Sequence, residues 1–231
     1  MNQQALSLLR RDSVANADMI YPILRGTARI LQADEDGVIL IDEPSALCFA
    51  DLPDTDGSVQ KLMALRQIRG YALHSDALAD RFSRMTRVKR TLRLKQVVYE
   101  GKTAPHVARV CSIRKLQEAD APEFERLMPY DDAQELHALI LSGNMYGAFI
   151  GDMPVGRIGL HAEGCMGLLA VDPDFRRRGV GEALESHLIR ELLSAGRTPY
   201  GQVVRENTAS MTLCREMGFT FSDGEITMLY R

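Results

Sequence analysis

The 231-residue sequence lacks the features of several large functional classes. Its four cysteines are widely spaced and form no C-x-x-C pair, which argues against a disulfide scaffold and against a zinc site. No apolar run approaches the length of a membrane span, and the first residues lack the basic and then apolar segments of a signal peptide. We therefore expect a cytoplasmic protein with reduced thiols, no metal and no membrane association.

An excess of basic charge is also missing. The net charge is −3, which argues against nucleic acid as a partner. Two familiar phosphate-binding loops are absent as well, since there is no G-x-x-x-x-G-K-[ST] and the three-glycine dinucleotide pattern is not met. With 45% apolar residues, a chain of this length can bury one large core or two smaller ones.

Two similar successions of secondary-structure elements follow each other along the chain. For residues 1–101 the patterns predict helices at 2–11 and 14–24, strands at Thr27–Ala33, Val38–Asp42 and Ala46–Leu52, a helix at Ser58–Arg69, a strand at Tyr71–His74, a helix at Asp76–Met85 and a strand at Leu92–Tyr99. For residues 106–231 they predict a strand at Val107–Ile113, helices at Ala119–Met128 and Asp132–Leu141, strands at Tyr146–Ile150, Val155–His161 and Met166–Val171, a helix at Val180–Ala195, a strand at Tyr200–Val204, a helix at Thr208–Met217 and a strand at Ile226–Tyr230.

This repeated order predicts two tandem domains, 1–101 and 106–231, joined by a linker at Gly101–Pro105. The expected fold class is α+β, a three-layer arrangement in which each domain has a mixed, mostly antiparallel sheet flanked by helices. The interpretation depends on the order of elements, because the residues of the two halves show no convincing identity.

The segment from Met166 to Gly181 carries the strongest chemical signal. An apolar strand, Met166–Val171, is broken by Asp172-Pro173-Asp174, and Arg176–Gly181 then opens an amphipathic helix. The first N–H groups of a helix have no intrahelical partner and point the same way as the positive end of the helix dipole. Glycine at this place lets the backbone approach a bulky anion closely, and arginine adds charge and planar donors. The segment therefore predicts a phosphate site.

Two motifs resemble those of one known family. Arg176-x-x-Gly179-x-Gly181 after Val171-Asp172-Pro173 resembles the coenzyme A pyrophosphate loop of the GNAT superfamily of N-acetyltransferases. The run from Asn207 to Phe219, with Ser210, Leu213, Cys214, Met217 and Gly218 at matching places, is similar to the closing motif of that superfamily. The resemblance covers about residues 106–231. The tandem plan is similar to that of glycine N-acyltransferase-type members, with a degenerate GNAT-like first half.

The resemblance implies a fold, a cosubstrate and a set of binding residues. It implies a GNAT fold that binds acetyl-CoA and transfers the acetyl group by direct attack of a neutral amine. The residues that would hold the coenzyme are Leu169, Ala170 and Val171 along the pantetheine arm, Arg176, Arg177, Arg178, Gly179, Val180, Gly181 and Glu182 around the pyrophosphate, and Asn207 facing the pantetheine.

Three residues are candidates for proton transfer. Glu163 is the first candidate for the general base and His161 the second, because both precede the central strand on the side expected for the acceptor. The alternative is that Glu163 is a polar turn residue. Cys214 stands where the superfamily commonly has the tyrosine that protonates the leaving thiolate. A cysteine is a poorer donor, so the alternatives are a packed Cys214 with water, Tyr200 or Tyr146 as the acid.

The first half is expected to bind no coenzyme. Where the second half has its arginines, the first has Asp51, Asp54 and Asp56, whose carboxylates would repel a diphosphate. We therefore expect one coenzyme per chain. The first half is expected to form one wall of the acceptor cleft or the contact of a homodimer.

The resemblance to glycine N-acyltransferase-type members implies a small-molecule amine or amino acid as the acceptor. One alternative is a protein N-terminus or lysine, for which Asp131, Asp132 and Glu135 would form an acidic lip. The other is a coenzyme A-binding sensor or interaction module without turnover, a reading that the cysteine at position 214 keeps open.

Overall fold

The structure is a computed structural model that describes residues 1–127 and 133–230. The chain divides into two compact units. Unit 1 comprises Met1–Val98, Gln202–Met211 and the residues from Thr220 onward, and unit 2 comprises Tyr99–Gly201 and Thr212–Phe219. The domain division at 1–101 and 106–231 stays a prediction. The compact units differ from it because two segments of the second half count with unit 1.

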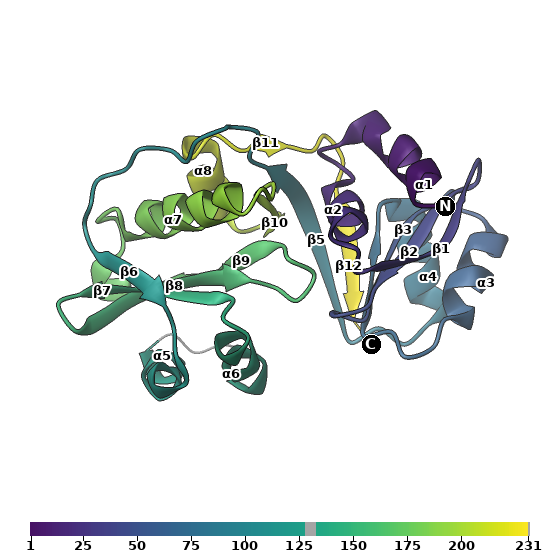
Figure 1. The fold of residues 1–231 in the computed structure, drawn as a ribbon. Helices are drawn as coiled ribbons and strands as arrows, with labels where there is room; N and C mark the ends of the chain where they lie inside the picture. The colour runs from purple at the N-terminus through teal and green to yellow at the C-terminus, as the bar shows by residue number, and fades with distance from the viewer. Residues whose placement is uncertain (128–132, 231) are drawn as a thin grey trace. The chain divides into compact units, whose positions relative to one another are not determined.

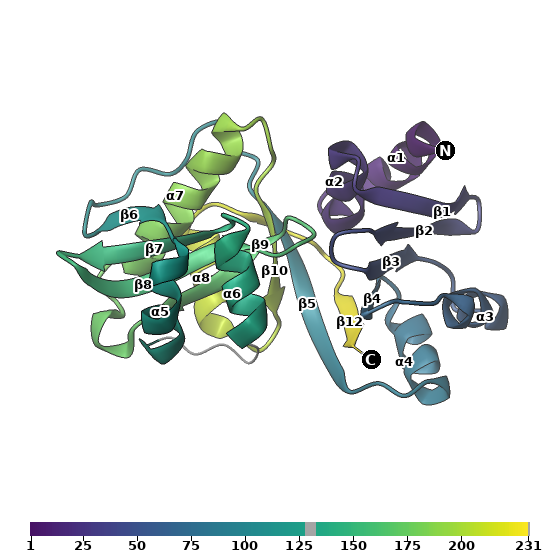
Figure 2. The ribbon, with the colours of Figure 1, turned by 60° about the horizontal axis from the view of Figure 1, so that its bottom comes forward.

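Unit 1 contains a mixed sheet in the order β1-β2-β3-β4-β12-β5. Its elements are α1 (Asn2–Leu9), a 3₁₀ turn at Arg10–Asp12, α2 (Ala17–Arg25), β1 (Ala28–Asp34), β2 (Gly37–Asp42), β3 (Leu47–Asp51), α3 (Asp56–Ala64), β4 (Gly70–Leu73), α4 (Asp76–Met85), β5 (Arg90–Val98), β11 (Thr220–Phe221) and β12 (Ile226–Tyr230). All pairs along the sheet are antiparallel except β3 with β4, and β11 pairs with β5. The strand β12, from the last residues of the chain, thus lies between β4 and β5 (Figure 2).

Helices cover both faces of the unit 1 sheet (Figure 2). Successive side chains of β3 point to opposite faces of the sheet, so this strand contributes to the core on each face. Phe49 packs in the cluster under α1 and α2, whereas Cys48 and Ala50 pack in the cluster under α3 and α4. Strands buried on both faces are typical of a three-layer arrangement. The predicted fold class is therefore confirmed for this unit.

Unit 2 has an antiparallel sheet in the order β9-β8-β7-β6. Its elements are β6 (Ser112–Lys115), a 3₁₀ turn at Glu118–Asp120, α5 (Ala121–Leu127), α6 (Ala133–Leu141), β7 (Met145–Ile150), β8 (Met153–Leu160), β9 (Met166–Val171), a 3₁₀ turn at Pro173–Phe175 and α7 (Val180–Ser194), followed by β10 (Tyr200–Val204) and α8 (Thr208–Glu216), which both continue into residues counted with the other unit. The helix α7 lies on one face of the sheet, and α5 and α6 lie on the other (Figure 1).

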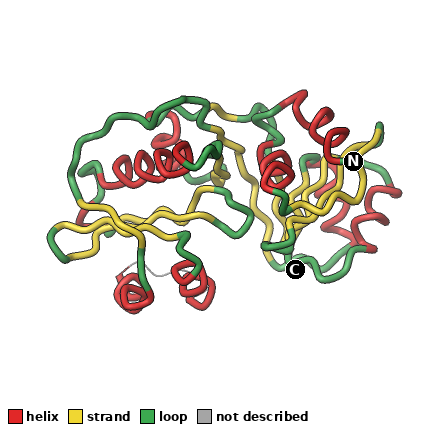
Figure 3. The backbone as a smooth tube through the Cα atoms, viewed as in Figure 1, coloured by secondary structure: helices red, strands yellow, loops and turns green. Residues whose placement is uncertain are grey.

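Two predicted boundaries are wrong. The helix predicted to end at Arg69 ends at Ala64, because Leu65 is extended and the Arg69 amide bonds the Ala46 carbonyl at 3.0 Å, which brings the chain alongside β3. The strand predicted at Val107–Ile113 is β6 at Ser112–Lys115, and a loop precedes it (Figure 3). The short strand β11 was not predicted. Parts of the helices predicted at Ala119–Met128 and Asp132–Leu141 lie outside the described residues.

Candidate coenzyme site

The predicted phosphate loop connects β9 to the N-terminus of α7. Asp172 caps the 3₁₀ turn by accepting a hydrogen bond from the Asp174 amide at 2.9 Å. Gly179, the N-cap of α7, has a φ of 82°, in the left-handed region that favours glycine. No side chain caps this helix, and its first bond runs from the Ala183 amide to the Gly179 carbonyl at 3.0 Å. The amides of residues 180–182 therefore have no partner within the helix and can donate to an anion.

Three arginines directly precede these amides in the chain. Arg176 donates through Nε to the Val171 carbonyl at 3.1 Å, which fixes its guanidinium at the end of β9. The Arg178 guanidinium lies 5.2 Å from the centre of the Phe175 ring. Arg176, Arg177 and Arg178 are all exposed, so their planar donors are available to a diphosphate. The residues present at this loop thus fit the charge and shape of the coenzyme's pyrophosphate.

The corresponding place in unit 1 is built differently. The N-terminus of α3 is capped by Thr55, whose Oγ1 accepts from the Ser58 amide at 3.1 Å. Asp54 and Asp56 beside it are paired with Arg81, at 2.5 and 2.8 Å. The start of α3 thus has a side-chain cap where α7 has none, which supports the prediction of one coenzyme per chain. Both helices carry an acidic residue in the first turn, Asp56 in α3 and Glu182 in α7.

The strands ahead of the two helices also differ. In unit 1, β3 and β4 pair over four positions, from Leu47↔Gly70 to Ala50↔Leu73. In unit 2, β9 pairs with β10 at a single position, Gly201↔Met166. Among the described residues, β9 therefore pairs with β10 at Met166 alone, and a pantetheine arm would require such an open strand edge beyond that point.

The middle of β9 is distorted. Leu168 has a φ of 60°, which is uncommon for a residue with a side chain, and the register with β8 shifts opposite it. Arg157, 3% exposed, donates to the Leu168 carbonyl at 3.0 Å and holds this bulge. The predicted pantetheine residues Leu169, Ala170 and Val171 follow the bulge and are half-buried. Sequence reasoning missed Arg157, although a lone arginine in the apolar strand β8 was a usable signal.

The two candidate bases lie together in the turn between β8 and β9. The Gly164 amide closes this turn on the His161 carbonyl at 2.8 Å. Glu163 is 9% exposed, and its carbonyl accepts from the Tyr200 hydroxyl at 2.8 Å. The His161 ring lies over Gly167, where an added Cβ would come within 2.6 Å of Nε2. The structure thus joins Glu163, His161 and Tyr200 at the start of β9, and their catalytic roles stay predictions.

Cys214 lies elsewhere, buried on α8 beside Glu185 of α7. Burial, with a smaller contribution from the Glu185 charge, raises the pKa of the Cys214 thiol to about 12. Burial raises the pKa of the Glu185 carboxyl to about 7. Glu185 was not predicted, because helical periodicity places it on a face without saying what packs there. These environments favour the alternative in which Cys214 is a packed residue.

Replacing Cys214 with alanine is expected to change turnover by less than about threefold. A thiol with a pKa of about 12 is a weaker acid than an ordinary thiol, with a pKa of about 8.5, so it cannot readily protonate the thiolate of a coenzyme. The measurement is the rate of thiol release together with coenzyme affinity. A tenfold or greater loss of turnover at unchanged affinity would instead make Cys214 the acid.

The remaining predicted residues have structural partners. Asn207 is exposed and caps α8, because its side-chain oxygen accepts a hydrogen bond from the Ser210 amide at 3.1 Å. Its contact with pantetheine stays a prediction. Tyr146 bonds Glu191 at 3.3 Å, and burial, with the Glu191 charge, raises its pKa to about 12. Of the predicted acidic lip, Asp131 and Asp132 lie outside the described residues, as does the side chain of Glu135.

Comparisons with known proteins find similarity to N-acetyltransferases. The sequence profile described as "FR47-like protein" matches residues 147–227. The [Ribosomal protein bS18]-alanine N-acetyltransferase of Salmonella typhimurium is 46% identical over 52 residues, which are 22% of this chain and 35% of that protein. A solved structure of a Drosophila protein aligns over 100% of this chain and 95% of its own, with a TM-score of 0.73 and 15% identity. A GCN5-related N-acetyltransferase-like protein from Streptococcus suis aligns over 98% and 100%, with a TM-score of 0.57 and 10% identity.

In its loop, in residues 147–227 and in its fold the chain is thus similar to N-acetyltransferases of the GNAT superfamily, the resemblance that the two motifs predicted. The chain spans about a third of the length of the curated relatives that it matches, 35%. Among the described residues, no group of three histidine, cysteine or acidic side chains is placed to hold a metal ion. No helix in residues 1–127 or 133–230 is both long and apolar enough to cross a membrane.

Proposed function

We propose that this protein is an acetyl-CoA-dependent N-acetyltransferase whose acceptor is the primary amine of a small molecule or amino acid. The uncapped N-terminus of α7, with its left-handed Gly179 and exposed arginines, is the observation that carries the proposal. The start of α3 is an internal contrast, because the Thr55 side chain caps it and takes up one of the amides that are open in α7.

In this proposal the residues of the chain bind acetyl-CoA and orient it for attack by the amine. Acetyl-CoA supplies a thioester, from which an attacking amine takes the acetyl group as an amide while the coenzyme leaves as a thiol. The residues 180–182 and the three arginines hold the diphosphate, and the distorted strand β9 positions the arm that follows it. A neutral amine is needed for attack, so a group at the acceptor side must take its proton.

A thiol-release assay with acetyl-CoA and a panel of small amines tests the proposal. We expect coenzyme A to bind in calorimetry and at least one amine to raise the rate of thiol release. If coenzyme binds and no amine raises the rate, the protein is a coenzyme-binding module without turnover. If no coenzyme binds, the loop assignment itself is wrong.

Replacing Glu163 with glutamine is expected to lower turnover by about 100-fold and to flatten its alkaline rise, because the amide keeps the shape of the side chain but cannot accept a proton. The pH profile of thiol release measures this. Asp152→Asn, an exposed charge change in the turn before β8, is the matched control and should leave the profile unchanged. A Glu163→Gln profile identical to that of the wild type would remove Glu163 as the base.

A protein N-terminus is the second candidate acceptor. It is favoured by the similarity to the [Ribosomal protein bS18]-alanine N-acetyltransferase, whose name specifies an alanine of a protein as the acceptor. Free alanine and a peptide that begins with alanine distinguish the two acceptors, because both present the same α-amino group. Preference for the peptide would replace the small-molecule proposal. A cytoplasmic location and a homodimer belong to the same proposal, and light scattering of the purified chain tests the dimer.

A further inference from the structure

Glu185 is a buried carboxyl group of unit 2 that the proposed function does not use. It lies on α7, is 9% exposed, and has no hydrogen-bond or ion-pair partner among the described residues. Burying a polar group without a partner costs free energy. Folding alone therefore does not explain why a carboxyl group stands at this position.

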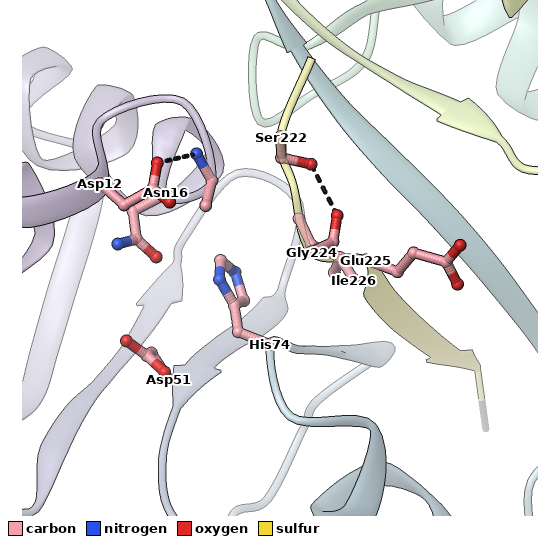
Figure 4. A pocket seen from close by; sticks show the side chains of 9 residues that line it. Asp12, Asn16, Asp51, His74, Ser222, Gly224, Glu225 and Ile226 are labelled. Atoms are coloured by element: carbon pink, nitrogen blue, oxygen red, sulfur yellow. Dashed lines mark hydrogen bonds between the residues drawn. The ribbon is translucent and has the colours of Figure 1, made fainter.

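The other buried charged side chains in the part of the chain that the structure describes have partners. Asp42 accepts a hydrogen bond from the Ser45 hydroxyl at 2.7 Å. The side chain of Asp18 is 1% exposed and lies 3.2 Å from Nε2 of His74, which lines a cavity of about 200 Å³ in unit 1 (Figure 4). Glu185 is the exception among these groups, so its partner is expected to come from outside the chain.

Glu185 lies on the face of α7 that is turned to α8. A Cβ added at Gly181, one turn before Glu185, would lie 3.6 Å from the Leu213 side chain of α8. Burial, and to a smaller extent the Glu185 charge, raise the pKa of the Cys214 thiol on α8, so these two side chains lie near each other. Residues four apart on a helix share a face, and positions 181 and 185 thus both face α8.

The neighbouring face of α7 packs on the sheet and shows how the helix runs. A Cβ added at Gly156 of β8 would come within 3.0 Å of the Leu184 side chain, and Gly156 pairs with Val171, the last residue of β9. The first turns of α7 therefore lie beside the end of β9, and the helix runs antiparallel to that strand (Figure 1). A ligand that starts at the amides of residues 180–182 and follows the open edge of β9 passes the second turn of α7, where Glu185 lies.

We propose that the Glu185 carboxyl group binds the pantetheine arm of coenzyme A through a hydrogen bond, close to the diphosphate. This inference rests on the proposed function, because it requires the coenzyme at the loop. Glu185 follows Gly181 by four residues, about 6 Å along the helix axis, so it faces the part of the arm nearest to the diphosphate. Pantetheine carries a hydroxyl and two amide groups, which donate and accept hydrogen bonds. Burial raises the pKa of Glu185 to about 7, so the carboxyl group is partly protonated at neutral pH and can also do both.

Calorimetry with two ligands tests the assignment. Coenzyme A carries the arm, whereas 3′-phosphoadenosine 5′-diphosphate keeps the nucleotide and the diphosphate without it. Glu185→Leu removes the hydrogen-bonding group at a similar side-chain volume and should weaken coenzyme A binding at least about tenfold. Binding of the nucleotide should stay unchanged or become slightly tighter, because a negative charge near the diphosphate is lost. Glu185→Gln keeps a donor and an acceptor and should bind coenzyme A within about threefold of the wild type.

A melting curve and a control variant complete the test. The leucine variant should melt at a higher temperature, since an apolar side chain replaces a buried polar group without a partner. Glu216→Leu makes the same change at an exposed position of α8 and should alter both affinities by less than about twofold.

Three results would overturn the inference. Unchanged coenzyme A binding by Glu185→Leu would mean that the carboxyl group is only hydrated, and equal weakening for both ligands would mean that the loop is disturbed. A glutamine variant that binds as weakly as the leucine variant would exclude the hydrogen bond. If the wild type binds neither ligand, the proposed function itself fails.

Discussion

Gly181→Asp is expected to weaken coenzyme A binding by about 100-fold or more while leaving the thermal stability of the protein unchanged or slightly higher. A carboxylate in the first turn of α7 interacts favourably with the helix dipole and the open amides, so the helix itself gains. The same carboxylate occupies the place of a diphosphate and repels it, and a loss of about 100-fold corresponds to about 2.7 kcal/mol. Calorimetric titration and a melting curve measure the two effects.

The matched control is Gly181→Ala. A Cβ at this position would lie 3.6 Å from the Leu213 side chain, an ordinary contact distance, so a methyl group fits. We expect the alanine variant to bind coenzyme within about threefold of the wild type. An aspartate variant that binds as well as the alanine variant would mean that the diphosphate is held elsewhere.

His74→Ala is expected to lower the free energy of unfolding by about 3 kcal/mol, the largest stability effect that we predict. It would leave the buried Asp18 carboxylate without its charged partner, which is costly inside a protein. Urea unfolding followed by circular dichroism measures the loss. The double variant His74→Ala with Asp18→Asn removes the stranded charge, so it should recover part of the stability. No recovery would show that the loss comes from packing.

The ion pair also predicts a pH dependence. Burial lowers the pKa of His74, but the Asp18 carboxylate, with Asp51 and Asp12 further away, more than offsets this and raises it above its ordinary value of 6.5. A raised pKa in the folded state means that the stabilisation is complete below about pH 6.5 and is lost as the pH rises through the folded value. The stability difference between wild type and His74→Ala should therefore be largest in mild acid. A difference that grows in alkali would contradict the raised pKa.

Local sequence patterns predicted most helices and strands. They failed where contacts with residues far away in the chain determine the end of a helix or the partner of a strand. Short apolar runs bounded by turn residues identified the buried strands β2 to β4, and helical periodicity identified the helix α7. The sequence has no glycine or proline at the end of α3, where Leu65 is extended, and the Arg69 amide beyond it bonds the distant Ala46 carbonyl. The position of β12 between β4 and β5 was also out of reach, because strand patterns do not specify a partner.

The residues of the candidate site also fall into those that the sequence could predict and those that it could not. The coenzyme loop could be predicted because its glycines, arginines and following helix are contiguous in the sequence. Arg157, Glu185 and the pair of His74 with Asp18 could not, since their significance comes from burial against residues far away in the chain. From the sequence, a titratable side chain is expected to lie on the surface, and its burial becomes known only from the fold.

Because β12 lies between β4 and β5, the sheet of unit 1 can be completed only after residues 226–230 have been synthesised. Ile226 and Met228 fill the core under α1 and α2, and Leu229 fills the core under α3 and α4. While a ribosome is still adding the residues before them, both cores of unit 1 lack a central strand and the edges of β4 and β5 stay open. The sheet β6 to β9 of unit 2 contains no strand from the end of the chain. The half of the protein that is synthesised first is therefore expected to be the last to become fully native.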